Sequence, residues 1–171
     1  MKQNHIFSAL ELKMPDMLAW AIAEGNDVNE QREDGATPLL LAVSWKQAWS
    51  VRMLLENGAD PDLGENGFSP LMIAAQENAV EIASILAEKA NVNFKGKYGL
   101  TSLMVAARDG NNEIVRILLE KGADPSIQTD QGSTALDMAR HFNQVETATL
   151  LEVKLPPGLS SYFSVYHIKT P

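Results

Sequence analysis

Cysteine is absent from the 171 residues of this chain, and histidine occurs only three times. Without cysteine there is no disulfide framework and no thiolate to act as a nucleophile or metal ligand. The histidines are His5, His141 and His167, and no two of them have the spacing of a metal site. Metal-dependent and thiol chemistry are therefore not expected of this protein.

An excess of positive charge is also missing, because 14 lysines and arginines stand against 22 aspartates and glutamates. Nucleic-acid binding needs a basic surface that neutralises phosphates, so a formal charge of −8 argues against such a partner. The acidic excess is concentrated in residues 1–67, which carry 11 acidic and 5 basic side chains, a net charge of −6. This half can attract a basic protein partner, and solubility is the alternative explanation.

Long apolar runs and catalytic motifs are lacking as well. No apolar stretch is long enough to span a membrane, and the opening MKQNHIFSALELK has no unbroken apolar core of the signal-peptide type. The sequence has no G-x-G-x-x-G, no phosphate-binding P-loop and no G-x-S-x-G. Most carboxylates stand at expected helix ends, where capping explains them. We therefore expect a cytoplasmic protein that is not an enzyme, has no cofactor and binds no membrane.

What the sequence does contain is a repeat of 32 or 33 residues. Its best example runs from Gly99 to Gly132, where Thr101 can cap a short helix that Gly110 ends. A second short helix follows and stops at Gly122. Neither helix is long enough to be stable alone, so copies must pack together. The copies are marked by glycine, leucine and alanine in fixed order at Gly35, Leu39 and Ala42; Gly67, Leu71 and Ala74; Gly99, Leu103 and Ala106; Gly132, Leu136 and Ala139.

This period resembles that of the ankyrin repeat, whose core is T-P-L-H-x-A. The matching segments are GATPLLLA at 35–42, GFSPLMIA at 67–74 and GSTALDMA at 132–139. The histidine of that core is replaced in every copy, by Leu40, Met72, Met104 and Asp137. The resemblance implies an all-α solenoid of about five helix-pair repeats joined by short hairpin fingers, and the missing histidine, which braces the turn in the family, leaves the rigidity of the fingers open.

The register divides the chain into a cap repeat at 1–31, repeats at 32–63, 64–94 and 95–128, a second cap repeat at 129–155 and a C-terminal tail at 156–171. Trp20 takes a leucine register and is expected in the core. Repeat three has EKANVN where repeat four has EKGADPS, so it has lost the glycine that ends the second helix. Either a non-glycine residue takes the left-handed conformation there or the helix ends differently, and this is the expected weakest junction.

The tail after residue 155 carries Tyr162, Phe163 and Tyr166, which is too apolar for a typical disordered end. We expect it to dock on the last repeat or on a partner, and a frayed terminus is the alternative.

In the ankyrin family partners usually bind the concave face, and the resemblance carries this face to two sets of positions. The first-helix set is Leu41, Ser44, Trp45, Ile73, Gln76, Glu77, Val105, Arg108, Asp109, Met138, His141 and Phe142. The finger set is Glu33, Asp34, Ala36, Glu65, Asn66, Phe68, Lys97, Tyr98, Leu100, Asp130, Gln131 and Ser133. Aromatic and aliphatic residues among polar ones are typical of protein-binding surfaces, and packing against the next first helix is the alternative for each residue alone.

The expected function is therefore binding of another protein by a chain that is monomeric when free. By analogy of fold, a small ankyrin protein with little besides its repeats is similar to the bacterial immunity proteins that neutralise a toxin. The alternative is a small regulatory scaffold or an inhibitor of an endogenous enzyme such as a kinase.

Overall fold

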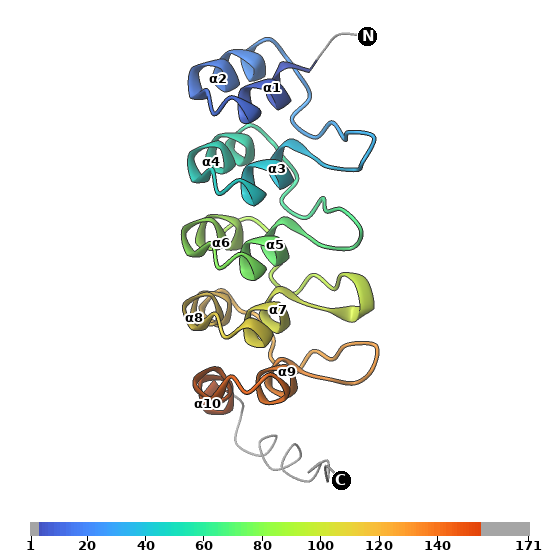
Figure 1. Ribbon diagram of the computed structural model, residues 1–171, viewed down its shortest axis with the longest axis vertical. Helices are drawn as coiled ribbons and strands as arrows, with labels where there is room; N and C mark the ends of the chain where they lie inside the picture. Colours follow the sequence, from blue (N-terminus) through green and yellow to red (C-terminus); the bar gives the residue numbers. More distant parts are fainter. Residues whose placement is uncertain (1–3, 155–171) are drawn as a thin grey trace.

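Ten α-helices form a regular stack in the computed structural model, which describes residues 4–154 (Figure 1). The first helices of the five pairs are α1 (His5–Glu11), α3 (Pro38–Ser44), α5 (Pro70–Gln76), α7 (Ser102–Asp109) and α9 (Ala135–His141). The second helices are α2 (Pro15–Ala23), α4 (Ala48–Glu56), α6 (Val80–Ala87), α8 (Asn112–Glu120) and α10 (Val145–Lys154). The short 3-10 helix η1 (Lys97–Gly99) lies between α6 and α7.

First helices stack on first helices and second helices on second helices, so the molecule is two layers of helices with fingers extending from one side (Figure 1). Within the described residues, extended pairing is limited to one bridge between Glu65 and Phe68 in a finger. The predicted all-α solenoid of five helix pairs with hairpin fingers is confirmed. Among residues 4–154, no helix combines the length and the apolar character that crossing a bilayer requires.

Each finger ends at a hydroxyl that starts the next first helix. The Thr101 hydroxyl accepts a hydrogen bond from the Met104 N–H at 3.3 Å, as the sequence predicts. The other cap residues are Thr37, Ser69 and Thr134, each accepting from the backbone N–H three residues on. Asp137 adds a reciprocal bond to the Thr134 backbone N–H at 2.8 Å, which completes a capping box. These caps fix where every first helix leaves its finger.

The core follows the repeated leucines and alanines. Leu39, Leu71, Leu103 and Leu136 are buried, and the alanine three residues after each is fully buried, which lets neighbouring first helices approach closely. In the second helices the fully buried leucines are Leu54, Leu86, Leu118 and Leu151. In repeat four the buried leucine is the first of the pair Leu118–Leu119, whereas in the last repeat it is the second of the pair Leu150–Leu151.

Repeat three ends its second helix differently from its neighbours. After α4 and α8, Gly58 and Gly122 take the left-handed conformation, with φ angles of 88° and 86°. After α6 no residue up to Asn91 has a positive φ, and the N–H groups of Lys89 and Ala90 both donate to the Leu86 carbonyl, at 2.9 and 2.8 Å. Of the two expected alternatives, the helix thus ends differently and avoids left-handed strain.

The side chains that join finger bases of successive repeats match this difference. Asn93 donates from its side-chain amide to the Gly122 carbonyl at 3.2 Å and accepts from the Asp124 N–H at 2.8 Å. Asn29 makes the same two bonds to repeat two, with Gly58 and Asp60, at 3.0 and 2.8 Å. An amide suits this place because it can donate and accept at once.

Where the glycine is missing, the amide is replaced by a carboxylate. Asp62 holds this position in repeat two, and its two oxygens accept from the Asn91 N–H of repeat three at 3.0 and 3.1 Å. No glycine carbonyl is present for Asp62 to reach, so a side chain that only accepts satisfies the junction. Asp62 in repeat two thus matches the missing glycine in repeat three, because the junction there offers a donor but no glycine carbonyl.

Trp20 corrects one expectation. Its side chain is 49 % exposed, not part of the core. The equivalent residues in the other second helices, Met53, Ile85, Ile117 and Leu150, are half-buried at the edge of their layer. A larger side chain at this edge extends into solvent. The docking predicted for the tail with Tyr162, Phe163 and Tyr166 concerns residues outside the described range.

Candidate functional site

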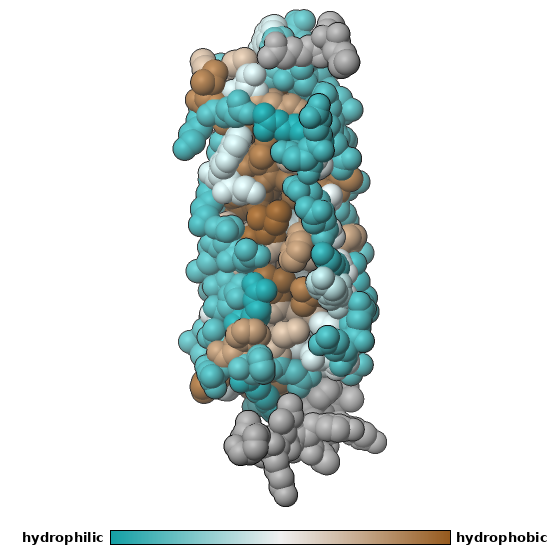
Figure 2. All heavy atoms as spheres, turned by 45° about the vertical axis from the view of Figure 1, so that its right-hand side comes forward, coloured by the Kyte–Doolittle hydropathy of each residue, from teal (hydrophilic) through white to brown (hydrophobic). Residues whose placement is uncertain are grey.

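A groove runs along the molecule between the fingers and the first helices. Figure 2 shows an apolar strip along the length of this face, bordered on both sides by hydrophilic residues. We call this surface the groove and define it by the predicted first-helix and finger residues. The first helices lie between the fingers and the second helices, so each repeat contributes one finger and one helix to it (Figure 1).

The floor of the groove comes from one position of each first helix. Leu41, Ile73 and Met138 are half-buried there and pack against the core. Val105 differs, because its side chain is only 1 % exposed. Ala36 is likewise buried at a finger base. Both were expected to offer contact surface; instead they support the floor from beneath.

The last residues of the first helices form one edge of the groove and are mostly exposed. They are Ser44 and Trp45, Gln76 and Glu77, Arg108 and Asp109, His141 and Phe142; among them only Arg108 is half-buried. Trp45 is 38 % and Phe142 47 % exposed. Two large aromatic side chains therefore stand in solvent at equivalent places of repeats two and five.

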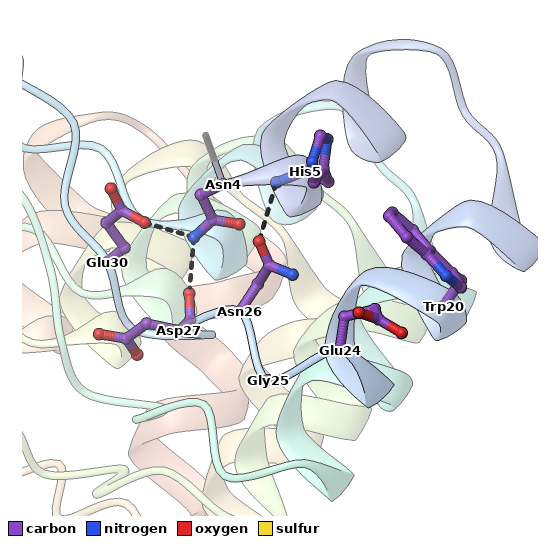
Figure 3. A pocket seen from close by; sticks show the side chains of 8 residues that line it. All are labelled: Asn4, His5, Trp20, Glu24, Gly25, Asn26, Asp27 and Glu30. Carbon is purple, nitrogen blue, oxygen red and sulfur yellow. Dashed lines mark hydrogen bonds between the residues drawn. The ribbon is translucent and has the colours of Figure 1, made fainter. Parts of the chain in front are cut away.

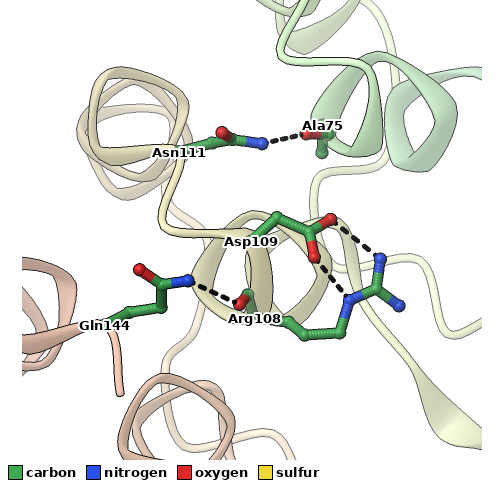
Figure 4. Close-up of polar contacts among 5 residues, drawn as sticks. All are labelled: Ala75, Arg108, Asp109, Asn111 and Gln144. Carbon is green, nitrogen blue, oxygen red and sulfur yellow. Dashed lines mark hydrogen bonds and ion pairs between the residues drawn. The ribbon is translucent and has the colours of Figure 1, made fainter. Parts of the chain in front are cut away.

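The charged residues at this edge are engaged within the chain. Arg108 forms a double hydrogen bond with Asp109, at 2.7 Å from Nε and 2.8 Å from a terminal nitrogen (Figure 4). This hydrogen bond raises the pKa of Arg108, although partial burial opposes the rise. The Lys46 ammonium donates to the Glu77 carbonyl at 3.0 Å and lies 3.6 Å from its carboxylate.

Amide side chains hold the ends of the first helices in place from the next repeat. Asn111 donates to the Ala75 carbonyl at 2.7 Å and Gln144 to the Arg108 carbonyl at 3.2 Å (Figure 4). Gln47 makes the corresponding bond to Leu10 at 2.9 Å. Ala79 stands at this place in repeat three and has no side-chain donor. These amide contacts tie the edge between repeats except at the junction of repeats two and three, where the Lys46 ammonium reaches the Glu77 carbonyl instead.

The finger tips of repeats three and four are tight two-residue turns. Asn66 and Gly67 both have positive φ, 53° and 80°, which is the turn type that Asn-Gly favours in hairpins. In the next finger Tyr98 takes the left-handed conformation, with φ 61° and ψ 21°, and its side chain is 65 % exposed. A bulky residue rarely adopts this conformation, because its Cβ crowds the backbone. Tyr98 is therefore an exposed aromatic ring on a strained turn.

Backbone hydrogen bonds join three of the fingers. The Lys97 N–H donates to the Gly67 carbonyl at 2.9 Å, and the Asp130 N–H donates to the Tyr98 carbonyl at 3.1 Å. In the described part of the chain no such bond joins the finger at residues 32–36 to the next one. The fingers of repeats three to five are thus braced without the family's histidine, which answers the question of their rigidity.

The groove holds a hollow between α7 and α9. This hollow of about 720 Å³ brings together predicted residues from two fingers and two helices, and we call it the anchor hollow. Its predicted lining residues are Leu100, Val105, Arg108, Gln131, Ser133, Met138, His141 and Phe142. Met104, Asp137 and Arg140 also line it, and the prediction missed them as contact residues. The other predicted residues lie elsewhere along the groove.

A second hollow, of about 230 Å³, lies at the N-terminal repeat beside Trp20 and His5 (Figure 3). Its polar groups serve the chain itself: the Asn4 side chain donates to the Asp27 carbonyl at 2.9 Å and caps α1, and the Asn26 side chain accepts from the His5 N–H at 3.1 Å. Across residues 4–154 no group of three or more histidine, aspartate or glutamate side chains is arranged to hold a metal ion.

Comparison with known families agrees with this architecture. A profile described as ankyrin repeats in three copies matches residues 6–96, more than half of the chain. The chain belongs to the ankyrin-repeat family. A second profile of ankyrin repeats in many copies matches residues 85–139. No curated relative matches the sequence closely. Ankyrin repeats are protein–protein interaction modules and are typically not enzymes, so membership of the family makes this chain a protein-interaction module.

Proposed function

We propose that this ankyrin-repeat protein occupies a partner protein through the groove and thereby inhibits it, as an immunity protein neutralises a bacterial toxin. The observation that carries the proposal is the apolar strip of Figure 2 together with Trp45 and Phe142, which are exposed at the ends of α3 and α9. Exposed aromatic side chains over an apolar floor supply most of the binding energy in protein interfaces. Because the repeats fill nearly all of the described chain, binding itself is the activity available to it.

The charge of the fingers supports a basic partner. Glu33 and Asp34 are exposed on the first finger, and neither takes part in an ion pair among residues 4–154. Unpaired surface charge of one sign speeds the encounter with an oppositely charged protein more than it strengthens the final complex. The acidic fingers would then attract the partner and the apolar strip would hold it.

The test is co-expression of this protein with the product of the gene next to its own in a bacterial host. If that product is a toxin, growth is expected to recover with the wild-type protein and to fail with a Trp45→Ala, Phe142→Ala double variant. Calorimetry with the purified pair should give a loss of about 2 kcal/mol or more, a weakening of about 30-fold. Circular dichroism should show unchanged helix content.

Trp49→Ala is the matched control, because Trp49 is 46 % exposed but lies on α4, among the second helices. The control variant should bind like wild type. The proposal is wrong if the double variant still protects the host and binds the toxin normally, or if Trp49→Ala removes binding as fully as the double variant.

A further inference from the structure

The anchor hollow has a small finger residue of repeat five in its lining. Phe68 and Leu100 hold the same position in repeats three and four, where they are half-buried against the core. Ser133 holds it in repeat five, where it lines the hollow, and Ala36 holds it in repeat two. A serine fills much less space than a phenylalanine or leucine, so it leaves more room between the last finger and α9. Its volume of about 720 Å³ is that of a small-ligand pocket.

The charged groups around the hollow are already paired. Arg108 is held by Asp109, and Arg140 donates to Glu152 at 2.7 Å. The Asp137 carboxylate accepts from the Thr134 N–H and hydroxyl at 2.8 and 2.7 Å. An incoming charged group would have to compete with these internal partners and lose its own hydration. The hollow is therefore poorly suited to an ionic ligand.

Apart from Gln131, Ser133 and His141, the rest of the lining is apolar and adaptable. Leu100 and Met138 are half-buried at the wall, Met104 lies beneath them, and Phe142 stands exposed at the rim with its ring 4.9 Å from that of His141. Methionine side chains adjust their shape to a guest because they are unbranched and flexible. Burying such a surface under another apolar group is favourable without any further polar contact.

We infer, on the basis of the proposed function, that the anchor hollow takes one large uncharged apolar side chain, aromatic or leucine-like, from the partner protein. The hollow thus sets specificity within the groove: the partner segment over α7 and α9 is neutral and apolar, although the partner as a whole is basic. Ser133 is the residue that determines it, since the side chain at that position decides whether the guest has room.

The inference can be tested without the partner by nuclear magnetic resonance on the full chain with labelled methionine methyl groups. The probes are N-acetyl-tryptophanamide, N-acetyl-leucinamide and N-acetyl-lysinamide. The two apolar probes should shift the methyl signals of Met104 and Met138 in a saturable way, with dissociation constants on the order of millimolar. Met17 and Met53, on α2 and α4, are internal references and should not move.

Ser133→Phe should weaken binding of the tryptophan probe at least tenfold, and Ser133→Ala is the matched control that should bind as wild type does. The inference is overturned if neither apolar probe shifts Met104 and Met138, if the lysine probe shifts them equally, or if Met17 and Met53 shift as much. It is also overturned if the same methyl signals change on dilution without probe, because a second copy of the chain would then fill the hollow.

The proposed function is tested through Trp45 and Phe142 and the role of the hollow through Ser133, so the two can fail separately although Phe142 also lines the hollow. If Ser133→Phe protects a host from the toxin as well as wild type does, while the Trp45 and Phe142 variant does not, the specificity role of the hollow is wrong and the proposed function stands. If the apolar probes bind as expected but the Trp45 and Phe142 variant still neutralises the toxin, the proposed function is wrong, and the inference that the hollow takes an apolar side chain stands.

Discussion

Insertion of a glycine between Lys89 and Ala90 restores the length of the other repeats, and we expect it to destabilise the protein. A glycine at a helix end ordinarily stabilises, because it takes the left-handed cap without strain. Here, however, α6 already ends without a left-handed residue, and the Asn91 N–H donates to both oxygens of Asp62. An added residue displaces the chain by up to about 3.8 Å, which is enough to break that contact.

The magnitude follows from the groups that lose their partners. A hydrogen bond to a charged group contributes about 1.5–3 kcal/mol when buried, and this one is exposed, so its loss costs about 1 kcal/mol. The inserted glycine also brings a carbonyl towards the Asp62 carboxylate, which has no hydrogen to donate. We expect a total loss of about 1–2 kcal/mol, which lowers the melting temperature by about 2–8 °C for a chain of this length.

Adding Asp62→Asn to the insertion should recover most of that loss, because the amide can then make the two bonds that Asn93 makes with repeat four. The measurement is a double-mutant cycle by chemical denaturation of four proteins: wild type, insertion, Asp62→Asn and both. We expect an interaction free energy of about 1 kcal/mol or more. The reverse cycle at the next junction, with Gly122 deleted and Asn93→Asp, is the control and should show the same coupling.

A higher melting temperature for the insertion alone would refute this reasoning, since it would mean that the glycine cap outweighs the contact at Asp62. Additive effects in the cycle would refute it as well, because the acid and the missing glycine would then be unrelated.

Three further predictions concern the fingers. Tyr98→Asn should raise the free energy of unfolding by about 0.5–1 kcal/mol, because relief of the left-handed strain outweighs the loss of the exposed contact with the Lys97 ammonium, which lies 5.1 Å from the ring centre. Asn66→Tyr should lower the free energy of unfolding in the same assay. If Tyr98→Asn destabilises the protein, Tyr98 is not strained in the wild type. Glu33→Gln with Asp34→Asn should slow association with a basic partner at low salt and leave dissociation nearly unchanged in a surface-binding experiment, whereas an unchanged association rate would exclude steering. The pKa of Asp124 lies below its usual value because the Ser126 hydroxyl and backbone N–H donate to its carboxylate. These hydrogen bonds contribute to stability above about pH 4, and the contribution is lost as the pH falls through the lowered pKa. Ser126→Ala should therefore raise the pKa of Asp124 in a carboxylate titration and shift the acid loss of stability to higher pH.

The fold was predictable because its signals are local. Thr101 caps its helix and Gly122 ends the next one through contacts within a few residues, and the same pattern recurs in each repeat. Contacts between repeats join residues about 30 positions apart, as Asp62 joins Asn91, and no spacing rule indicates which side chains meet there. The missing glycine was visible in the sequence, but its partner in the preceding repeat was not.

The sequence predicts which positions line the groove, but not which of their side chains are exposed or paired. Register placed Met138 and Phe142 at the groove, and both line the anchor hollow. Register could not show that Val105 is covered by its neighbours or that Trp20 is not. Nor could it show that Arg140 would be paired, because its partner Glu152 lies on the other helix of the repeat. Exposure and pairing depend on the neighbouring repeats.

The two ends of the groove of this ankyrin-repeat protein differ in their charge and in how firmly their fingers are held. In the first finger, Glu33 and Asp34 have no ion-pair partner among residues 4–154, and no backbone bond holds this finger to the next. At the anchor hollow the charges are neutralised in pairs, and the fingers are joined through Gly67, Lys97, Tyr98 and Asp130. Long-range attraction needs unpaired charge but little rigidity, whereas close packing around an apolar side chain needs a preorganised wall and gains nothing from free charge. A partner is then expected to meet the acidic end first and to be held at the rigid end, so changes in salt should act mainly on association and changes at Ser133 or Phe142 mainly on dissociation.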